Sequence, residues 1–327
     1  MTRWRWAAGL VVVGALGVGL AWDWDWFRPM VERQASAALG MNVTLGHFDL
    51  RLGRQVVATG DAVAMADPGP FATVKRVSLS FDVASMLRHW EISVAVVRIE
   101  QPMLELQQQD SAMADWLAPV GKVSEAAAAW RVGQIQILDG QAHLTALRGQ
   151  GDMRFTYATT EAVGETPGAI TIDLTGNHQG MPITGHFEGG APLSLRDAAV
   201  PYPASLRIQS GPTLIAMQGT IRNPLNFVGA DLSFEIAGPD MALLLPLIGL
   251  PTPRTPSYHL TGQFAVTDGQ IVLSGITGMV GSTDLAGTMQ IDATAAPPVV
   301  DLNQIRVRGC AEYGQQGATF ECFDSHA

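Results

Sequence analysis

The segment "RVSLSFDV", residues Arg76 to Val83, alternates apolar and polar side chains without a break. In an extended chain its apolar residues all point to one side, and these are Val77, Leu79, Phe81 and Val83. A period of two is typical of a β-strand with one apolar face and one solvated face. The segment therefore predicts an amphipathic strand.

The same alternation recurs along most of the chain, and turn signals separate the segments. The other clear segments are Phe48 to Leu52, Ile92 to Val96, Ile170 to Leu174, Leu232 to Ile236, Phe264 to Val266 and Leu285 to Ile291. The turn signals include "LDG" (Leu138–Gly140), "GNHQG" (Gly176–Gly180), "RNP" (Arg222–Pro224) and "TDG" (Thr267–Gly269). We expect a mainly β chain of roughly fourteen short strands, mostly antiparallel neighbours.

A sheet of this size with one apolar face must hide that face from water. If the sheet curls into a half-pipe, its lining is a continuous apolar groove that suits acyl chains. A closed β-sandwich with an ordinary core explains the alternation equally well. Under the groove hypothesis the candidate lipid-contacting residues are Phe48, Leu50, Val77, Leu79, Phe81, Val83, Ile92 and Val94.

Helical patterns are few. The segment from Phe27 to Gly40 has apolar residues at helical spacing, with Pro29 near its start and Gly40 as a C-cap. Two other short helices are predicted, at Ser124–Trp130 and within Pro239–Gly249. The last is apolar enough to be a plug, a lid or a membrane-touching segment, although burial against the sheet is the commoner explanation.

The N-terminus predicts one membrane span. Ala7 to Ala21 is wholly apolar or glycine, with Arg3 and Arg5 before it and acidic residues after it, so residues 1–6 should stay cytoplasmic, 7–22 should span the membrane and 23–327 should be periplasmic. A belt of tryptophans brackets the span at the predicted interface, namely Trp4, Trp6, Trp22, Trp24 and Trp26. A signal peptide cleaved before Trp22 is the alternative, and the aromatic belt beyond that point favours a retained anchor.

The two cysteines, Cys310 and Cys322, lie near the C-terminus of an otherwise Cys-free chain. In an exported protein such a pair predicts one disulfide, worth roughly 3 kcal/mol through restriction of the unfolded chain. A zinc site would need two more ligands, and only His326 lies near.

Composition and motifs argue against several function classes. The net charge of −10 would repel a nucleic-acid backbone. The seven histidines are dispersed, and His178 and His186 with Glu188 are the nearest approach to a metal cluster, although they form no recognised motif. The chain has no G-x-S-x-G nucleophile elbow. We therefore expect no catalytic residues, no bound metal and no cofactor.

Several longer segments resemble the AsmA family of Gram-negative envelope proteins. The resemblance rests on their order along the chain: "DWDWFRPMVERQASAALGMNVTLGHFDLRLG" (Asp23–Gly53), "VKRVSLSFDVASMLRHWEISVAVVRIEQPMLELQ" (Val74–Gln107), "GPDMALLLPLIGLPTPRTPSYHLTGQFAV" (Gly238–Val266) and "GMVGSTDLAGTMQID" (Gly278–Asp292). Where many relatives have Asn-Trp, this chain has Asp115-Trp116.

This resemblance implies a single-pass inner-membrane protein whose periplasmic part is a curled antiparallel sheet of the bridge-like lipid-transfer type. It implies phospholipid and the membrane as partners, with other envelope proteins as further candidates, and a role in outer-membrane biogenesis. At about 4.8 Å per strand, the expected sheet looks short for a lone bridge across the periplasm, so a relay or a groove completed by a partner is also expected. The alternative function is a scaffold that regulates outer-membrane protein assembly without carrying lipid.

Overall fold

The computed structural model describes most of the chain beyond the first 23 residues. The described residues are 24–39, 42–51, 56–66, 70–81, 93–108, 131–146, 151–160, 168–178, 180–196, 200–224, 228–243, 254–267, 270–292, 299–311 and 321–326. By internal contacts the chain divides into two compact units. The first comprises 1–102 and 122–134, and the second comprises 103–121 and 135–327.

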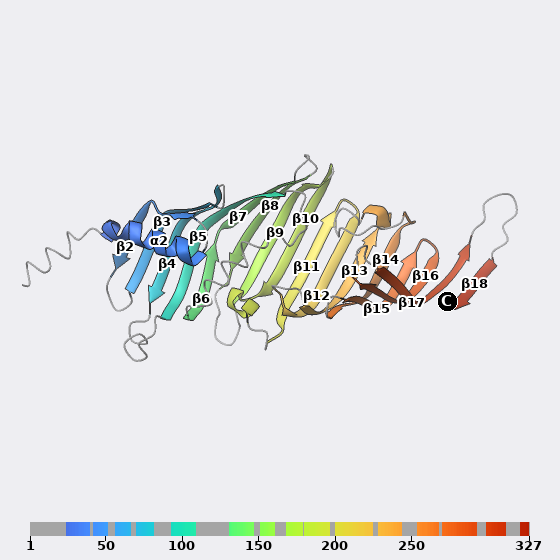
Figure 1. The fold of residues 1–327 in the computed structure, drawn as a ribbon. Coiled ribbons are helices and arrows are strands. Elements are labelled where there is room, and N and C mark those ends of the chain that lie inside the picture. Colours follow the sequence, from blue (N-terminus) through green and yellow to red (C-terminus); the bar gives the residue numbers. More distant parts are fainter. Residues whose placement is uncertain are drawn as a thin grey trace, which may run out of the picture. The chain divides into compact units, whose positions relative to one another are not determined.

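The first unit begins with a 3₁₀ turn and a helix and continues with strands (Figure 1). Its elements are η1 (Trp24–Phe27), α2 (Arg28–Leu39), β1 (Asn42–Thr44), β2 (His47–Arg51), β3 (Val56–Ala66) and β4 (Pro70–Phe81). Strands β1 and β2 both pair with β3, which pairs with β4, and all these pairings are antiparallel. Strands β5 (Ser93–Gln108) and β6 (Arg131–Leu138) contribute residues to both units.

The second unit holds the longer run of strands. Its elements are β7 (Gly140–Ala146), β8 (Gly151–Thr159), β9 (Ala169–His178), β10 (Met181–Gly190), η2 (Pro192–Arg196), β11 (Tyr202–Ser210), β12 (Thr213–Asn223), β13 (Val228–Gly238), η3 (Met241–Leu243), β14 (Tyr258–Thr267), β15 (Gln270–Val280), β16 (Thr283–Asp292), β17 (Val299–Ala311) and β18 (Glu321–His326).

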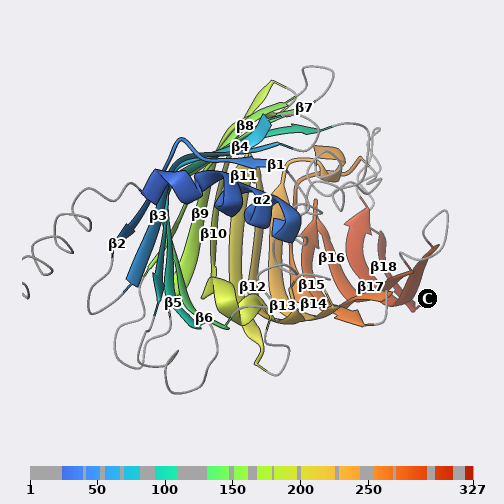
Figure 2. The same cartoon turned by 60° about the vertical axis from the view of Figure 1, so that its left-hand side comes forward.

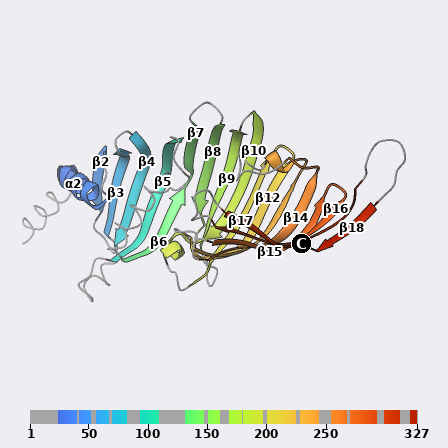
Figure 3. The same ribbon diagram turned by 45° about the vertical axis from the view of Figure 1, so that its right-hand side comes forward.

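From β7 to β18 each strand of the second unit pairs antiparallel with the next along the chain. Figure 3 shows these strands side by side with alternating directions from β8 to β10. The predicted turn signals lie between strands, because Asp139 (φ 52°) separates β6 from β7 and Gly180 (φ 82°) precedes β10. The prediction of a mainly β, largely antiparallel chain is confirmed.

One pairing departs from that prediction. The second half of β5, Met103 to Gln108, pairs parallel with Gln141 to Ala146 of β7. A parallel pair needs a long connection between its strands. The chain between β5 and β7 is long enough for such a connection. The alternation of apolar and polar residues within single strands does not indicate which strands pair in parallel.

The helices agree with the sequence in one place and are shorter in another. The helix predicted from Phe27 to Gly40 is confirmed as α2. Within the predicted Pro239–Gly249 segment the helical element that the structure describes is the 3₁₀ turn η3. The predicted helix at Ser124–Trp130 lies outside the described residues.

The predicted membrane span at 7–22 also lies outside the described residues. Among the residues that the structure does describe, no helix combines the length and the apolar character needed to cross a bilayer.

Candidate functional site: an apolar sheet face

One face of the second unit is apolar from strand to strand. Residues that are partners in an antiparallel pair lie on the same face, so the register defines rows across the sheet. One such row runs through Ile172, Phe187, Leu206, Met217 and Phe234, from β9 to β13. The next row towards the turn between β11 and β12 runs through Leu174, Gly185, Ile208, Ile215, Ile236 and Leu260.

Two buried clusters border these rows at the two ends of the strands. The first cluster includes Tyr202, Ile221 and Leu232, and Leu195 of η2 packs against it. The second consists of Ile215 and Tyr258, with Met241 of η3 packed against it. Figure 2 shows η2 in yellow at one end of the strands and η3 in orange at the other. We name the region between the two short helices the apolar face.

Side chains of the apolar face differ in their burial, and Phe234 and Ile215 in its rows are 8% and 7% exposed. Leu232 and Leu260 are 4% and 6% exposed, whereas Phe187, Leu206 and Met217 are only half-buried. Half-buried apolar side chains that line up over several strands form a contiguous apolar surface, and such a surface marks a binding site more often than scattered single residues do.

Aromatic rings on this face lie over glycines of the neighbouring strand. A Cβ added at Gly262 would lie 2.8 Å from the Phe234 ring, and one added at Gly238 would lie 2.8 Å from the Tyr258 hydroxyl. The Tyr157 ring covers Gly140 in the same way. Glycine has no side chain, so it leaves room for the neighbouring ring at each of these positions.

The opposite face of the second unit, from β7 to β14, is polar. It carries three histidine–carboxylate pairs, with nitrogen–oxygen distances of 2.8 Å for His143–Asp152, 2.7 Å for His186–Asp173 and 3.0 Å for His259–Glu235. All of these carboxylates are at least 42% exposed, so the pairs add little to stability. The alternation therefore separates a solvated face from an apolar one.

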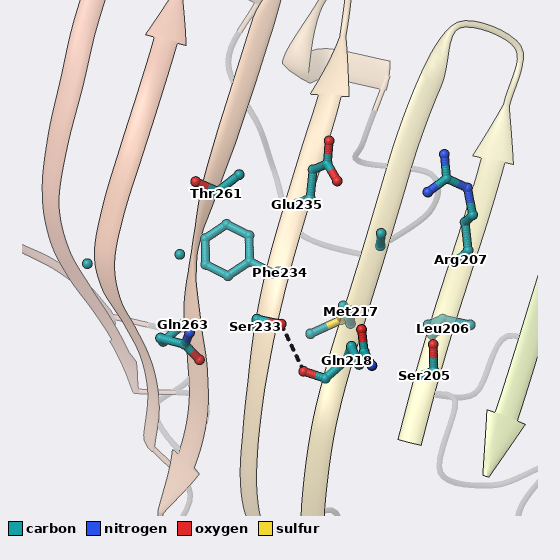
Figure 4. A pocket seen from close by; sticks show the side chains of 13 residues that line it. Ser205, Leu206, Arg207, Met217, Gln218, Ser233, Phe234, Glu235, Thr261 and Gln263 are labelled. Carbon is teal, nitrogen blue, oxygen red and sulfur yellow. Dashed lines mark hydrogen bonds between the residues drawn. The ribbon is translucent and has the colours of Figure 1, made fainter. Parts of the chain in front are cut away.

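A hollow of about 590 Å³ lies against β11 to β15 (Figure 4). Polar-face residues such as Arg207, Gln218 and Glu235 line it. Beside it the Ser233 hydroxyl donates a 3.0 Å hydrogen bond to the backbone carbonyl of Gln218. Polar side chains dominate its lining, so this hollow is unsuited to acyl chains.

In the first unit the register brings most of the predicted groove residues onto one face. Phe48 and Val77 are both opposite Gly60, and Leu50 and Leu79 are both opposite Ala58. Phe81 follows on the same face, opposite Val56. All five predicted residues are half-buried, and Val94 of β5 is fully buried. The structure does not describe Val83 or Ile92.

In this unit η1 contacts β2, and α2 contacts β1 and lies beside it in Figure 2. The backbone N–H groups of Val43, Leu45 and Phe48 donate to the Ser36 hydroxyl, the Glu32 carboxylate and the Asp25 carboxylate, at 2.9, 2.8 and 2.9 Å. Val43 and Phe48 are residues of β1 and β2, and Leu45 lies between these strands. An uncovered strand edge invites pairing with another chain. The segment after the predicted span thus closes one edge of the sheet, a role that sequence reasoning missed.

No family model matches the chain. A curated relative does match: the AsmA family protein YhjG of Escherichia coli (strain K12) is 29% identical over 137 residues, which cover 40% of this chain and 20% of that protein. Over these residues the chain is similar to an AsmA family protein, in agreement with the resemblance seen in its sequence. The matched part is about one fifth of the relative's length, so the functions of the whole relative cannot simply be transferred.

Other features predicted from the sequence fall partly within the described residues. Trp24 and Trp26 lie in η1, and Trp26 is 79% exposed, whereas Trp4, Trp6 and Trp22 lie outside the described residues. An exposed indole is available to a membrane surface, and the interfacial role of these tryptophans stays a prediction.

The predicted cysteine pair lies in β17 and β18, where Cys310 and Cys322 are direct partners in the register. Direct antiparallel partners have Cα atoms about 4.5 to 5.5 Å apart, within the range that a disulfide needs. The structure describes these two strands by their backbone, so the disulfide stays a prediction.

The weak metal candidates are not brought together. His186 pairs with Asp173, and within the described part of the chain no three potential metal ligands form a group.

Proposed function

We propose that this chain is a membrane-anchored envelope protein of the AsmA type that binds phospholipid on its apolar sheet faces and has no enzymatic activity. Residues 7–22 form its single span, with the N-terminus in the cytoplasm and the sheet in the periplasm of a Gram-negative bacterium. The protein acts in outer-membrane biogenesis. Membrane lipid is its main partner.

One observation carries this proposal: the apolar rows continue across consecutive strands of the second unit, bordered by η2 and η3. An acyl chain needs a long apolar surface without fixed polar contacts. Rows that cross the strands provide such a surface perpendicular to the strand direction, whereas single apolar residues would not.

The test compares lysine at two neighbouring positions of β12 that face opposite ways. Met217 lies in the middle of the apolar face, and Gln218 is exposed on the polar face. The full-length chain is extracted in mild detergent, and bound phospholipid is measured by native mass spectrometry. We expect wild type and Gln218→Lys to retain phospholipid and Met217→Lys to lose most of it, because a charge on the apolar face is costly to desolvate.

Circular dichroism melting of each variant separates loss of binding from loss of folding. Wild-type protein without bound phospholipid would contradict the proposal and favour the regulatory scaffold. If Met217→Lys unfolds the chain, Met217→Gln serves as the milder variant, and an unchanged lipid content in that variant would also count against the apolar face as the binding surface.

A further inference from the structure

Three hydroxyl groups on the apolar face are buried without a hydrogen-bond partner. Ser210, Thr213 and Tyr258 are 2%, 1% and 4% exposed, and none of their hydroxyl oxygens has a partner in the structure. A buried hydroxyl without a partner costs about 1 to 3 kcal/mol. Three such groups in one place indicate a site for a ligand that supplies hydrogen-bond acceptors.

The three groups lie at the same end of the strands. Ser210 and Thr213 are direct partners across the tight turn between β11 and β12. Tyr258 of β14 is opposite Gly238, and its ring lies over that glycine with the hydroxyl 2.8 Å from where a Cβ would be. Since Leu214 is opposite Ala237, continuation of the register puts Thr213 beside Gly238, directly under the Tyr258 ring.

A second tyrosine at the other end of the strands shows that the missing partner is particular to Tyr258. Tyr202 contacts Gly189 in the same way, and its hydroxyl donates a 3.0 Å hydrogen bond to the backbone carbonyl of Gly190. The fold can therefore provide a hydrogen-bond acceptor for a tyrosine hydroxyl in this arrangement. At the η3 end it provides none for Tyr258. Met241 packs against the cluster there, and its unbranched side chain can rotate aside.

The charges around the site favour a neutral acceptor over an anion. Burial raises the pKa of Tyr258 to about 12, and the nearby Asp240 carboxylate adds to the rise. The neighbouring Thr213 hydroxyl opposes part of that rise in the pKa of Tyr258. Tyr258 is thus a neutral donor at physiological pH, and the charge of Asp240 would repel a phosphate.

We propose that Ser210, Thr213 and Tyr258 form a polar subsite that donates hydrogen bonds to the ester carbonyls of a diacyl lipid. The acyl chains would then lie along the adjoining row of Ile208, Ile215 and Ile236. This assignment rests on the proposed lipid-binding function and adds to it the part of the lipid that is recognised. An ester-linked lipid fills the subsite, and an ether-linked lipid of the same headgroup leaves the hydroxyls without acceptors.

The test measures the affinity of the full-length chain for phosphatidylethanolamine in ester-linked and ether-linked forms. We expect wild type to prefer the ester form by about threefold to tenfold, as expected for one or two hydrogen bonds. Thr213→Val, which keeps the shape and removes the hydroxyl, should weaken ester binding, leave ether binding unchanged and raise the melting temperature. The control is Thr220→Val on the same strand, where the residue is exposed on the polar face.

The outcomes separate the two claims. If wild type binds neither lipid, the proposed function fails and the subsite fails with it. If wild type binds both forms equally and Thr213→Val changes neither affinity, lipid binding stands and the ester-recognising subsite is wrong. A higher melting temperature in Thr213→Val without any change in ester affinity would also overturn the subsite.

Discussion

The ring of Phe234 lying over Gly262 gives the most quantitative prediction about the apolar face. In Gly262→Ala the new Cβ would lie 2.8 and 2.9 Å from two carbons of the Phe234 ring and 3.0 Å from the backbone oxygen of Ser274. Side-chain carbons almost never approach other atoms this closely. The ring must therefore move off the strand, and the strand backbone limits any compensating shift.

We expect Gly262→Ala to destabilise the second unit by about 1 to 3 kcal/mol, the usual cost of overpacking. At about 2 to 4 °C for each kcal/mol, the melting temperature should fall measurably by circular dichroism. Gly185→Ala is the matched control on the same face, because its Cβ would lie 3.3 Å from the nearest atom, a carbon of Leu174. It should cost clearly less.

A double-mutant cycle with Phe234→Leu tests the cause. Leucine does not extend over residue 262, so the added methyl group should cost less in that background. We expect a coupling free energy of at least about 0.5 kcal/mol between the two substitutions. Strictly additive effects would refute the claim that this ring lies over Gly262.

Three further predictions concern the stability of the chain, measured by its melting temperature. Tyr202→Phe should destabilise the chain by about 0.5 to 1.5 kcal/mol, because it leaves a backbone carbonyl without its donor. Tyr258→Phe removes a hydroxyl without a partner and should raise the melting temperature, so equal losses in the two variants would contradict the hydroxyl assignments. Reduction with dithiothreitol should lower the melting temperature through the pair Cys310 and Cys322, and titration of free thiols in the oxidised chain would disprove the disulfide. Hydrogen bonds from backbone N–H groups hold the pKa of Asp240 below its ordinary 3.8, so its contribution to stability is present above pH 3.8 and lost as the pH falls further. Asp240→Asn should remove that part of the acid sensitivity, and an unchanged pH profile would argue against it.

The sheet could be predicted from the sequence because alternation depends only on neighbouring residues. Val77 and Leu79 fall on one face whatever their partners are, and the turn at Asp139 follows from local backbone preference. The register is different. Nothing near Gly262 in the sequence indicates that the Phe234 ring covers it, since the two residues meet only through strand pairing.

The polar parts of the candidate site were missed for a related reason. Ser210 and Thr213 flank a tight turn, where hydroxyls are common and usually solvated, so their burial could not be expected from composition. The edge contacts of Glu32 and Ser36 depend on how α2 packs against β1, which amphipathic periodicity alone does not specify. Long-range packing, rather than local pattern, decides both features.

The central claim, that the apolar face carries lipid in the cell, is tested most directly by site-specific photocrosslinking in cells labelled with ³²P-phosphate. A photoreactive phenylalanine analogue is inserted at Leu206 or Met217 on the apolar face, and at Ser205 or Gln218 on the polar face of the same strands. We predict that radiolabelled phospholipid becomes attached to the chain from the first two positions and not from the other two. Equal labelling from both faces, or none from Leu206 and Met217 in a folded chain, would contradict the account.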